Sequence, residues 1–332
     1  MNDVDPPAPA TAGRRRARRA GLVVAGLLLL AGLPITLARL TGWTASPSVV
    51  LMSFAPFALL PYLAATVLLV VLLVRRRGRL VAVGAGAAVL LLLVHVWWVA
   101  PLFVGSAPQP AAGAERVVVM SANVQFGSGD AAFVVDEVRE RGVDVLVVSE
   151  ITPTFLAAAD EAGLDELLPH RLGRAADRAA GTIVFTNEPA SEVAAVETAF
   201  VSLVVRTHDL TLLATHPAPP QSSGHWRREQ PLLLEAAREH DVDAVVGDLN
   251  ATLDHPVIRD LVGSGWRDAV ELTNGGFAPT WPENGEHGFP FPVVQIDHVL
   301  ARDSVAVVDV DSFAVPDTDH HAVVATLAAT AP

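Results

Sequence analysis

Three long apolar stretches in the first third of the chain constrain its fold more than any other feature. They run from about Gly21 to Ala38, from about Val49 to Val74 and from about Leu80 to Val104. Roughly 20 apolar residues cross the hydrocarbon core of a bilayer as a helix, so each stretch is long enough to span a membrane. The breaks between them are polar, basic or Pro-bearing. The pattern therefore predicts three transmembrane helices within residues 21–104.

The positions of the arginines predict how these helices are oriented. Five arginines lie within residues 14–19, before the first stretch, and four lie within residues 75–79, between the second and the third. Loops rich in Arg stay in the cytoplasm, and only Arg39 marks the loop after the first stretch. We therefore expect a cytoplasmic N-terminus, residues 1–20, and a C-terminal domain on the extracytoplasmic face. A cleaved signal peptide is the alternative for the first stretch, but two more long apolar stretches follow it.

The two parts of the chain differ in net charge. Residues 1–114 contain ten Arg and two Asp, a net charge of +8, and the remainder contains 13 Arg and 34 acidic residues, a net charge of −21. Nucleic-acid affinity depends on neutralising phosphates with basic side chains, so the acidic part makes nucleic acid an unlikely partner. The absence of Cys excludes thiolate metal sites and disulfides. Residues 105–115 are small, Pro-bearing and nearly uncharged, which is typical of a linker.

From Arg116 onward, short β-branched runs alternate with helical stretches, which is typical of an α/β fold. A polar strand end by itself is usually only solvated. Here, however, six runs each carry Asn, Glu, Asp or His at or near a strand end, and together they would form a site at one edge of a sheet. The runs are RVVVMSAN (116–123), VDVLVVSE (143–150), DLTLLATH (209–216), DAVVGDLN (243–250), VVQIDHVLA (293–301) and DTDHHAVVATL (317–327).

The order SAN, SE, TH, GDLNAT, IDH and DH along residues 116–327 resembles the endonuclease/exonuclease/phosphatase (DNase I-like) superfamily. The resemblance implies that residues 116–332 form a four-layered αββα sandwich, with two mixed sheets face to face and helices outside. It also implies a phosphoric ester hydrolase that depends on Mg²⁺ or Mn²⁺. More narrowly, the three-helix anchor with an outward domain resembles the VanJ-type membrane proteins associated with teicoplanin resistance.

Three matched positions are candidates for the metal site. Glu150 and Asn123 carry hard oxygen ligands suited to Mg²⁺ or Mn²⁺, the carboxylate binding directly and the amide positioning a water or a phosphate. Asp319, matched to the Asp of the family's Asp-His step, would complete the metal environment. The family usually has Ser before this Asp, and here the residue is Thr318.

Five matched positions are candidates for catalysis, because phosphoester hydrolysis needs charge neutralisation and an aligned water. Asp248 would orient or deprotonate the water, and Asn250 would bind a phosphoryl oxygen. His216 would donate to the charge that develops on phosphorus. His320, oriented by Asp297, would act as the second acid/base group, because a carboxylate partner fixes the imidazole tautomer and favours its charged form.

Several neighbours of these positions receive no catalytic role. His321 follows the matched His320, and His298 follows the matched Asp297, so both are expected to be structural. Trp281 is expected to pack beside the site. No acidic residue is evident as a partner for His216, which nuclease-like members have. Arginines 171, 174, 178, 227 and 228 either rim the site or solvate loops, and the sequence leaves both readings open.

We therefore expect a membrane-anchored, metal-dependent phosphoesterase that acts on a phosphorylated small molecule or lipid outside the cytoplasm. Anchoring raises the effective concentration of a lipid-linked substrate, such as an undecaprenyl-linked phosphate or pyrophosphate of the cell envelope. A secreted-face nuclease is the enzymatic alternative, which the charge of −21 disfavours. A non-catalytic envelope binding protein is the other alternative, which the intact set of acid, amide and His residues disfavours.

Overall fold

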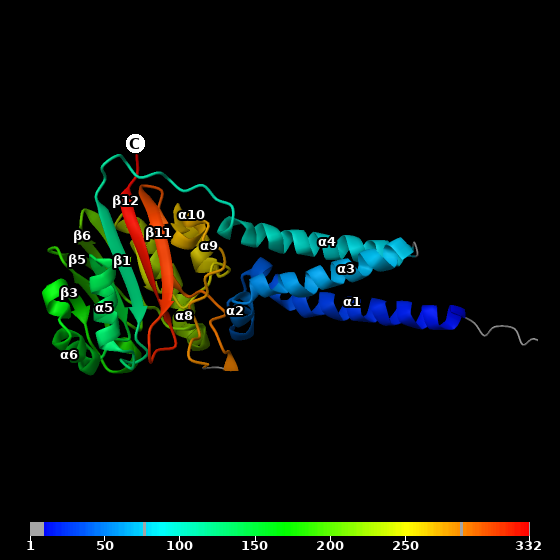
Figure 1. Cartoon of the computed structure of the whole chain (residues 1–332), viewed down its shortest axis with the longest axis horizontal. Coiled ribbons are helices and arrows are strands. Elements are labelled where there is room, and N and C mark those ends of the chain that lie inside the picture. The colour runs from blue at the N-terminus through cyan, green and yellow to red at the C-terminus, as the bar shows by residue number, and fades with distance from the viewer. Residues whose placement is uncertain (1–9, 76–77, 286–287, 332) are drawn as a thin grey trace, which may run out of the picture. The chain divides into compact units, whose positions relative to one another are not determined.

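The computed structural model describes residues 10–75, 78–285 and 288–331 (Figure 1). The chain divides into two compact units. The helical unit comprises Met1–Thr41 and Phe54–Ala100, and the sandwich unit comprises Gly42–Ser53 and Pro101–Pro332. The segment between the first two apolar helices thus belongs to the sandwich unit.

The helical unit consists of α1 (Ala10–Thr41), the 3₁₀ turn η1 (Ala55–Ala58) continued by α3 (Leu59–Arg75), and α4 (Arg79–Val99). Three helical stretches, Arg15–Thr41, Ala55–Arg75 and Arg79–Leu102, are long and apolar enough to cross a membrane. The three expected apolar helices are therefore present among the described residues.

The second apolar stretch begins later than the sequence pattern predicted. It was expected from Val49, but the helix α2 (Ser46–Met52) ends before the stretch that starts at Ala55. Pro56 accounts for the break, because a proline ring clashes with the carbonyl four residues earlier and disfavours a helical conformation at the preceding residue.

A buried polar cluster joins the three helices. The hydroxyl of Thr36 on α1 lies 2.5 Å from the Tyr62 hydroxyl of α3 and 3.0 Å from Nε2 of His95 on α4. The second ring nitrogen of His95 lies 2.9 Å from the carbonyl oxygen of Ala55. Polar groups in an apolar surrounding need such partners, so the cluster fixes how the helices pack.

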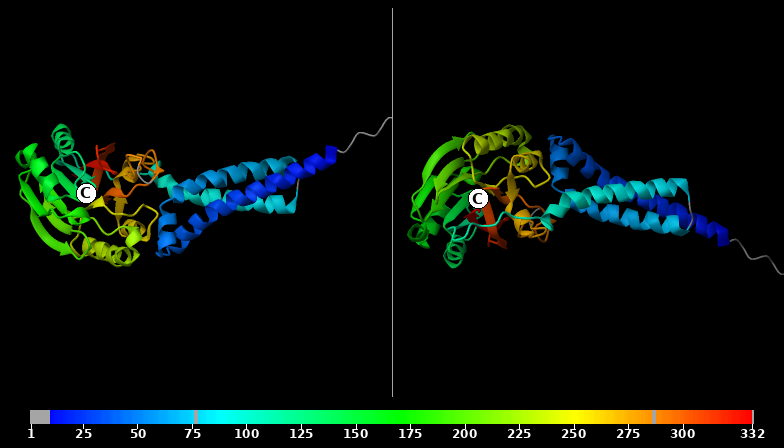
Figure 2. Two further views of the ribbon diagram at one scale, coloured as in Figure 1. Left: turned by 90° about the horizontal axis from the view of Figure 1, so that it is seen from below. Right: turned by 90° about the horizontal axis from the view of Figure 1, so that it is seen from above.

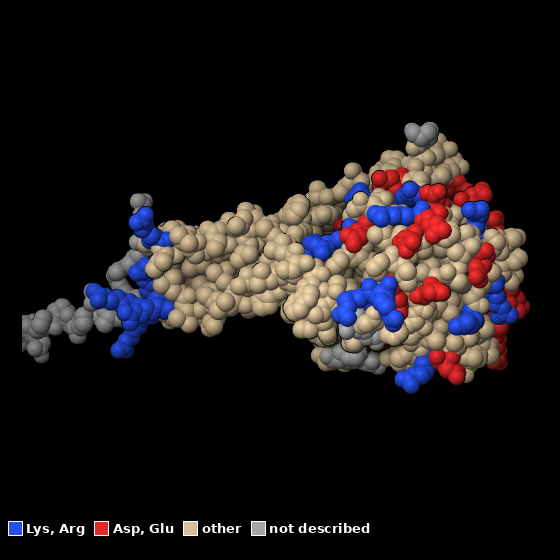
Figure 3. Space-filling model, turned by 180° about the vertical axis from the view of Figure 1, so that it is seen from behind, with Lys and Arg blue, Asp and Glu red and all other residues tan. Residues whose placement is uncertain are grey.

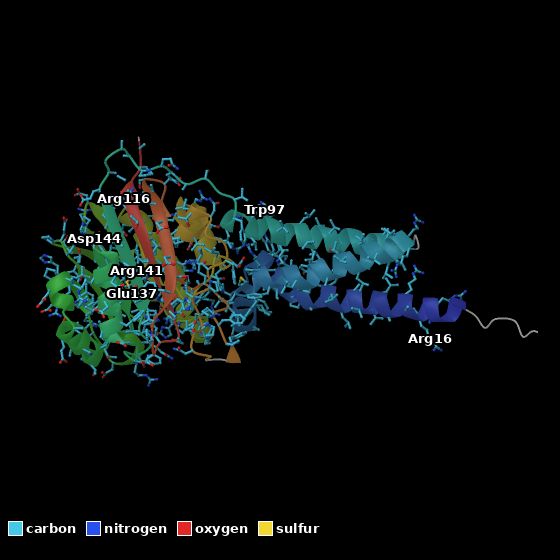
Figure 4. The ribbon with its side chains drawn as sticks, viewed as in Figure 1. Arg16, Trp97, Arg116, Glu137, Arg141 and Asp144 are labelled. Atoms are coloured by element: carbon cyan, nitrogen blue, oxygen red, sulfur yellow. The ribbon has the colours of Figure 1, made fainter. Side chains whose placement is uncertain are left out.

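Basic side chains gather at one end of the helical unit, and the face shown in Figure 3 carries almost no charge between its ends. The gathering follows from the up-and-down course of the helices, which places the start of α1, the end of α3 and the start of α4 at the same end. Arg16 lies at this end, and Trp97 lies at the other (Figure 4).

The sandwich unit contains two six-stranded mixed sheets. Only the pairs β1–β2 and β7–β8 are parallel. In spatial order, the first sheet is β11 (Val305–Ala314), β12 (His321–Ala329), β1 (Arg116–Asn123), β2 (Val145–Ser149), β4 (Thr182–Thr186) and β3 (His170–Arg174). The second is β5 (Ser191–Val196), β6 (Ser202–Thr207), β7 (Leu210–Ala214), β8 (Ala244–Asp248), β10 (Asp297–Arg302) and β9 (Trp266–Asp268).

Helices cover the outer faces of both sheets, and α5 and α8 lie on opposite sides of the pair (Figure 2). The described architecture is the expected α/β sandwich with two mixed sheets inside and helices outside. The remaining elements are α5 (Ala131–Arg141), α6 (Pro153–Glu161), α7 (Leu164–Leu167), α8 (Ser223–Glu239), α9 (Pro256–Val262), α10 (Ala269–Thr273) and the 3₁₀ turns η2 (Ala100–Leu102), η3 (Arg178–Ala180) and η4 (Pro220–Ser222).

Helix α5 shows how local sequence defines these elements. Asp130 caps its start by accepting a hydrogen bond from the Phe133 amide, and Gly142 ends it in a left-handed conformation. Val134 and Val138, one turn apart, are buried against the first sheet. The polar face carries Arg141, which pairs with Glu137 and Asp311 (Figure 4).

Side-chain alternation determines where the polar end of the sandwich lies. Successive side chains of a strand point to opposite faces. In β8, Ala244 and Val246 face the other sheet within the apolar core, and the inward Asp248 follows at the end of the strand. In β1, the inward Val119 is followed at the end by Asn123, whose amide contacts Asp248 across the two sheets. The apolar layer between the sheets therefore becomes polar at one end.

Gly247 permits a close approach of β7 and β8 at this end. Its φ is 145°, and a Cβ at this position would lie 2.0 Å from the carbonyl oxygen of Thr215. Every other residue type would push the two chains apart. Glycine thereby keeps His216, which follows Thr215, beside Asp248.

Candidate active site

The structure brings all eight residues that the sequence singled out to the polar end of the sandwich. Strand register accounts for much of this convergence. Asp297 stands directly opposite Asp248 in the β10–β8 pair, and Asn123 stands opposite Ser149, the residue before Glu150. The eight are Asn123, Glu150, His216, Asp248, Asn250, Asp297, Asp319 and His320.

Asn123 joins two carboxylates that come from different sheets. Its Nδ2 donates to Oε1 of Glu150 at 3.3 Å and to Oδ2 of Asp248 at 3.0 Å. Glu150 has a φ of 60°, and its second oxygen accepts a hydrogen bond from the Phe126 amide at 2.9 Å. This left-handed conformation costs a non-glycine residue free energy, and the hydrogen bonds offset the cost.

His320 and Asp297 form the expected oriented pair. Nδ1 of His320 lies 2.9 Å from Oδ2 of Asp297, which also accepts a hydrogen bond from the Thr280 hydroxyl at 2.7 Å. Because Nδ1 points to the carboxylate, Nε2 faces the site, 3.8 Å from Oδ2 of Asp248 and 3.8 Å from Oδ1 of Asp319. The pair therefore presents one ring nitrogen to the reaction centre.

His216 lies on the other side of the two carboxylates. Its Nε2 is 3.7 Å from Oε1 of Glu150 and 3.6 Å from Oδ2 of Asp248, and its ring stacks on Phe200 with a centroid distance of 4.8 Å. Both carboxylates belong to the proposed metal and catalytic set. Within the described residues, the ion pairs of His216 are with these two carboxylates.

Asn250 sits at a sharp turn after β8. Its φ is 48°, its backbone amide donates to Oδ1 of Asp248 at 2.8 Å, and its side-chain Nδ2 donates to the carbonyl of Pro217 at 3.0 Å. The turn thus connects the segment after β8 to the segment after β7. A shift of this turn would move Asp248 and Asn250 together.

Two supporting residues carried no recognisable sequence signal for their specific roles. Thr280 holds Asp297, and its hydroxyl also accepts hydrogen bonds from the backbone amides of Ile296 and Asp297. Trp281 was expected to pack beside the site, and its indole N–H donates to Oδ2 of Asp319 at 2.9 Å. Both lie in a long loop, where no strand or helix period indicates which side chains point inward.

His321 and His298, the neighbours of His320 and Asp297 in the sequence, make contacts outside the set of eight site residues. His321 pairs with Glu283 at 2.8 Å. His298 is fully buried between the Asp268 carboxylate at 2.6 Å and the Ala251 carbonyl at 2.8 Å. These contacts agree with the structural roles predicted for both. Arginines 174, 178 and 227 are exposed.

Burial and charge shift the proton affinities of the site. Burial, reinforced by Asp297, raises the pKa of Asp248 to about 7, and burial also raises the pKa of Glu150. Burial, with the charge of His320, lowers the pKa of His216 to about 3. Burial alone would lower the pKa of His320, but Asp297 outweighs it and raises this pKa to about 10. At neutral pH, His320 is therefore charged and His216 is neutral.

Residues 120–320 match the Endonuclease/Exonuclease/phosphatase family. The chain belongs to this family. Its enzymes are phosphoester hydrolases and are generally dependent on divalent metal ions. The match runs from within β1 to His320, the residue before β12. No curated relative matches the sequence.

Solved structures of family members share the fold. Truncated TDP2 from Caenorhabditis elegans is 17% identical with a TM-score of 0.51, and the alignment covers 64% of this chain and 98% of that one. D. rerio TDP2 complexed with a single-strand DNA product is 14% identical with a TM-score of 0.52, covering 64% and 99%. An AP endonuclease from Archaeoglobus fulgidus is 14% identical with a TM-score of 0.51, covering 63% and 98%.

The chemistry of the site fits the divalent cation that the family generally requires. Four buried or nearly buried carboxylates face one another, and among the described residues their ion pairs at the site are with histidines alone. The Asn123 NH₂ group bridges Glu150 and Asp248 and so supplies part of the positive charge that two adjacent carboxylates require. Hard oxygen donors of this kind favour Mg²⁺ or Mn²⁺.

One subset, Asp248, Asp297 and His320, offers ligand atoms within 4.8 Å of one another. A charged imidazole has no lone pair to give a cation, and Oδ2 of Asp297 already accepts two hydrogen bonds, which leaves only its Oδ1 without a hydrogen-bond partner among the described residues. We therefore favour the Asn123 and Glu150 side of the site for the metal.

The Asp297–His320 pair predicts a specific titration in metal-free protein. His320 should stay protonated above pH 8 and lose its proton only as the pH approaches about 10. Since this pKa is raised above the ordinary value of ~6.5, the pair stabilises the fold fully below that pH and less as the pH rises toward 10. In Asp297→Asn the carboxylate beside Nδ1 is gone while burial and the charges of Asp248 and Asp319 remain, so His320 should lose its proton at a clearly lower pH than in wild type. NMR of the imidazole C–H resonances in EDTA measures the pKa of His320 in wild type and in Asp297→Asn. Equal pKa values in the two proteins would contradict the pairing.

Proposed function

We propose that this chain is a membrane-anchored, Mg²⁺- or Mn²⁺-dependent phosphoesterase that acts at the extracytoplasmic face. The observation that carries the proposal is the convergence of eight residues, matched in order along the chain, at the polar end of a sandwich with this family's fold. Four carboxylates, two asparagines and two histidines are the groups that metal-assisted phosphoryl transfer requires.

The geometry supports a division of labour among the side chains. Asp248, with a pKa near 7, is suited to take a proton from the attacking water at neutral pH. His320, held as a cation by Asp297, is suited to neutralise charge and to donate a proton through Nε2. His216 and Asn250 would donate hydrogen bonds to phosphoryl oxygens.

Asn123, Glu150 and Asp319 would hold the metal. When bound, the cation supplies Lewis-acid neutralisation of the phosphoryl charge. Trp281 keeps one oxygen of Asp319 occupied, and the Phe126 amide does the same for Glu150. Each carboxylate is thus oriented by one hydrogen bond to its other oxygen, which fixes the direction of its remaining lone pairs.

The division of the chain into units supports the proposed location. The loop between the first two apolar helices and the chain after the third belong to one compact unit. If each of the three helices spans the membrane, these two parts emerge on the same side, which their common fold requires. The arginines at the opposite helix ends favour an extracytoplasmic location for that side.

The substrate class that we propose is a lipid-linked phosphate or pyrophosphate of the cell envelope. An anchored site meets such substrates at high effective concentration. The resemblance to VanJ-type proteins extends the proposal to undecaprenyl carriers and to glycopeptide resistance. Two of the similar solved structures are of a DNA-bound protein and an AP endonuclease. A nuclease remains the enzymatic alternative, which the charge of −21 on residues 115–332 disfavours.

To test this proposal, the activity of the purified full-length protein is measured with Mg²⁺ on lipid phosphates, lipid pyrophosphates, bis(p-nitrophenyl) phosphate and DNA. His320→Ala should lower kcat/KM by at least ~10²-fold, as expected for loss of an acid/base group. Asp297→Asn should cost the same or less, and the double variant should resemble His320→Ala because the two residues act as one unit. His321→Ala is the matched control and should stay within a few-fold of wild type.

Two results would contradict the assignment. Loss of activity in His321→Ala with activity kept in His320→Ala would place the motif one residue further along. Cleavage of DNA in preference to every lipid phosphate would replace the proposed substrate class with the nuclease alternative.

The absence of cysteine makes the proposed topology directly measurable. Single-cysteine variants at three exposed positions, Ala17→Cys, Ser46→Cys and Glu166→Cys, should differ in labelling by a membrane-impermeant maleimide added to intact cells. Ser46→Cys and Glu166→Cys should be labelled, and Ala17→Cys should be labelled only after the cells are opened. Labelling of Ala17→Cys alone in intact cells would reverse the orientation.

A further inference from the structure

The segment Gly42–Ser53 lies between two apolar helices in the sequence, yet it packs into the sandwich unit. Within α2, Val49 and Met52 are fully buried and Ser48 is nearly so. Helix α2 packs against η4, the turn that follows His216 by four residues. The segment therefore meets the sandwich beside the candidate active site rather than at a remote surface.

A buried histidine connects this segment to the loop after β8. Nδ1 of His255 accepts a hydrogen bond from the Thr252 amide at 2.8 Å, so Nδ1 carries no proton. The proton is then on Nε2, which donates to the carbonyl of Val49 at 2.8 Å. Both hydrogen bonds are fully buried, and burial lowers the pKa of His255 to about 4, which keeps the neutral ring in place at physiological pH.

A buried tryptophan continues the connection to the active-site turn. The ring of Trp226, on α8, meets the ring of His255 edge to face with a centroid distance of 5.5 Å. Its indole N–H donates to the backbone carbonyl of Asn250 at 3.3 Å. Trp226 is 1% exposed. A continuous buried path thus leads from Val49 through His255 and Trp226 to Asn250.

We propose that the segment between the first two membrane helices is a positioning element of the active site, acting through His255 and Trp226 on the Asn250 turn. The inference rests on the proposed phosphoesterase function for its kinetic consequence, although the path itself is a feature of the fold. Val49, His255 and Trp226 are positioning residues, because none of them contacts the reacting groups.

The Asn250 turn depends on such support because its conformation is unfavourable by itself. A φ of 48° is a left-handed conformation, which Asn tolerates better than most residues but does not prefer. The turn is held on one side by Asp248 and on another by the carbonyl of Pro217. Trp226 supplies a third contact, at the backbone carbonyl oxygen of Asn250. His255 links Trp226 to the segment Gly42–Ser53.

The consequence is that the packing of this segment and catalysis are linked in this chain. The segment is covalently flanked by two apolar helices but belongs to the sandwich unit. A chain in which the segment cannot pack against His255 should keep the catalytic side chains but place Asp248 and Asn250 less accurately. Because these two groups act on the reacting atoms, the loss should appear in kcat rather than in KM.

The test compares three variants of the full-length chain. One replaces Pro47–Met52 with Gly and Ser residues of equal number, one is Trp226→Phe, and one is the matched control Val50→Ser, in which an exposed side chain of the same helix changes. The readouts are kcat and KM for bis(p-nitrophenyl) phosphate with Mg²⁺, and amide hydrogen exchange of the peptide that covers residues 249–256.

The segment replacement should lower kcat by ~10-fold or more and leave KM within ~3-fold, since a ~10-fold change equals about 1.4 kcal/mol of transition-state stabilisation. Trp226→Phe removes one neutral hydrogen bond and should lower kcat by ~5-fold. Combining the two should cost no more than the replacement alone, as expected for a shared path. Hydrogen exchange in residues 249–256 should rise in the segment replacement and in Trp226→Phe. Val50→Ser should match wild type in kcat, KM and exchange.

Unchanged kcat and unchanged hydrogen exchange in the segment replacement would overturn the inference. So would a combined variant in which the losses in kcat of the replacement and of Trp226→Phe multiply. If the replacement chain does not accumulate in membranes, Trp226→Phe decides with the same two readouts. If the wild-type protein hydrolyses no phosphoester, the proposed function fails while the exchange measurement still tests the path.

Discussion

The burial of four carboxylates at one end of an apolar sandwich is the constraint on which the rest of this structure depends. Glu150, Asp248, Asp297 and Asp319 would repel one another strongly away from water. The fold offsets this with a charged His320, with the bridging amide of Asn123 and with hydrogen bonds to further carboxylate oxygens, although Oδ1 of Asp297 has no partner among the described residues. Burial raises the pKa of both Glu150 and Asp248, so a bound cation would favour their ionised forms.

The sequence predicted the strands and helices in which local pattern and tertiary burial agree. Strand β1 has the predicted bounds, Arg116–Asn123, because its continuous apolar run ends in a polar residue. The eight site residues were found because a family resemblance supplied their order. Thr280 was missed because its role depends on where a long loop passes, which no periodicity encodes.

In the segment Gly42–Ser53, hydropathy alone predicts the wrong environment. Its VVLM run was interpreted as the start of a membrane helix, but Val49 and Met52 are buried in the sandwich unit instead. Apolar composition predicts burial and does not distinguish protein from lipid as the surrounding medium. The prediction needed a partner, His255, that lies 206 residues beyond Val49 along the chain.

The binding of Mn²⁺ to the full-length protein tests the central claim, that the polar end of the sandwich is a metal-dependent phosphoesterase site. Titration followed by Mn²⁺ electron paramagnetic resonance should show binding in wild type and in the exposed-site control Glu166→Gln. Binding should be lost or at least ~10²-fold weaker in Glu150→Gln, because a neutral amide replaces a charged oxygen ligand. Hydrolysis should disappear in EDTA and return with Mg²⁺ or Mn²⁺ in the same preparations. Full hydrolysis in EDTA, or unchanged Mn²⁺ affinity in Glu150→Gln, would contradict the account.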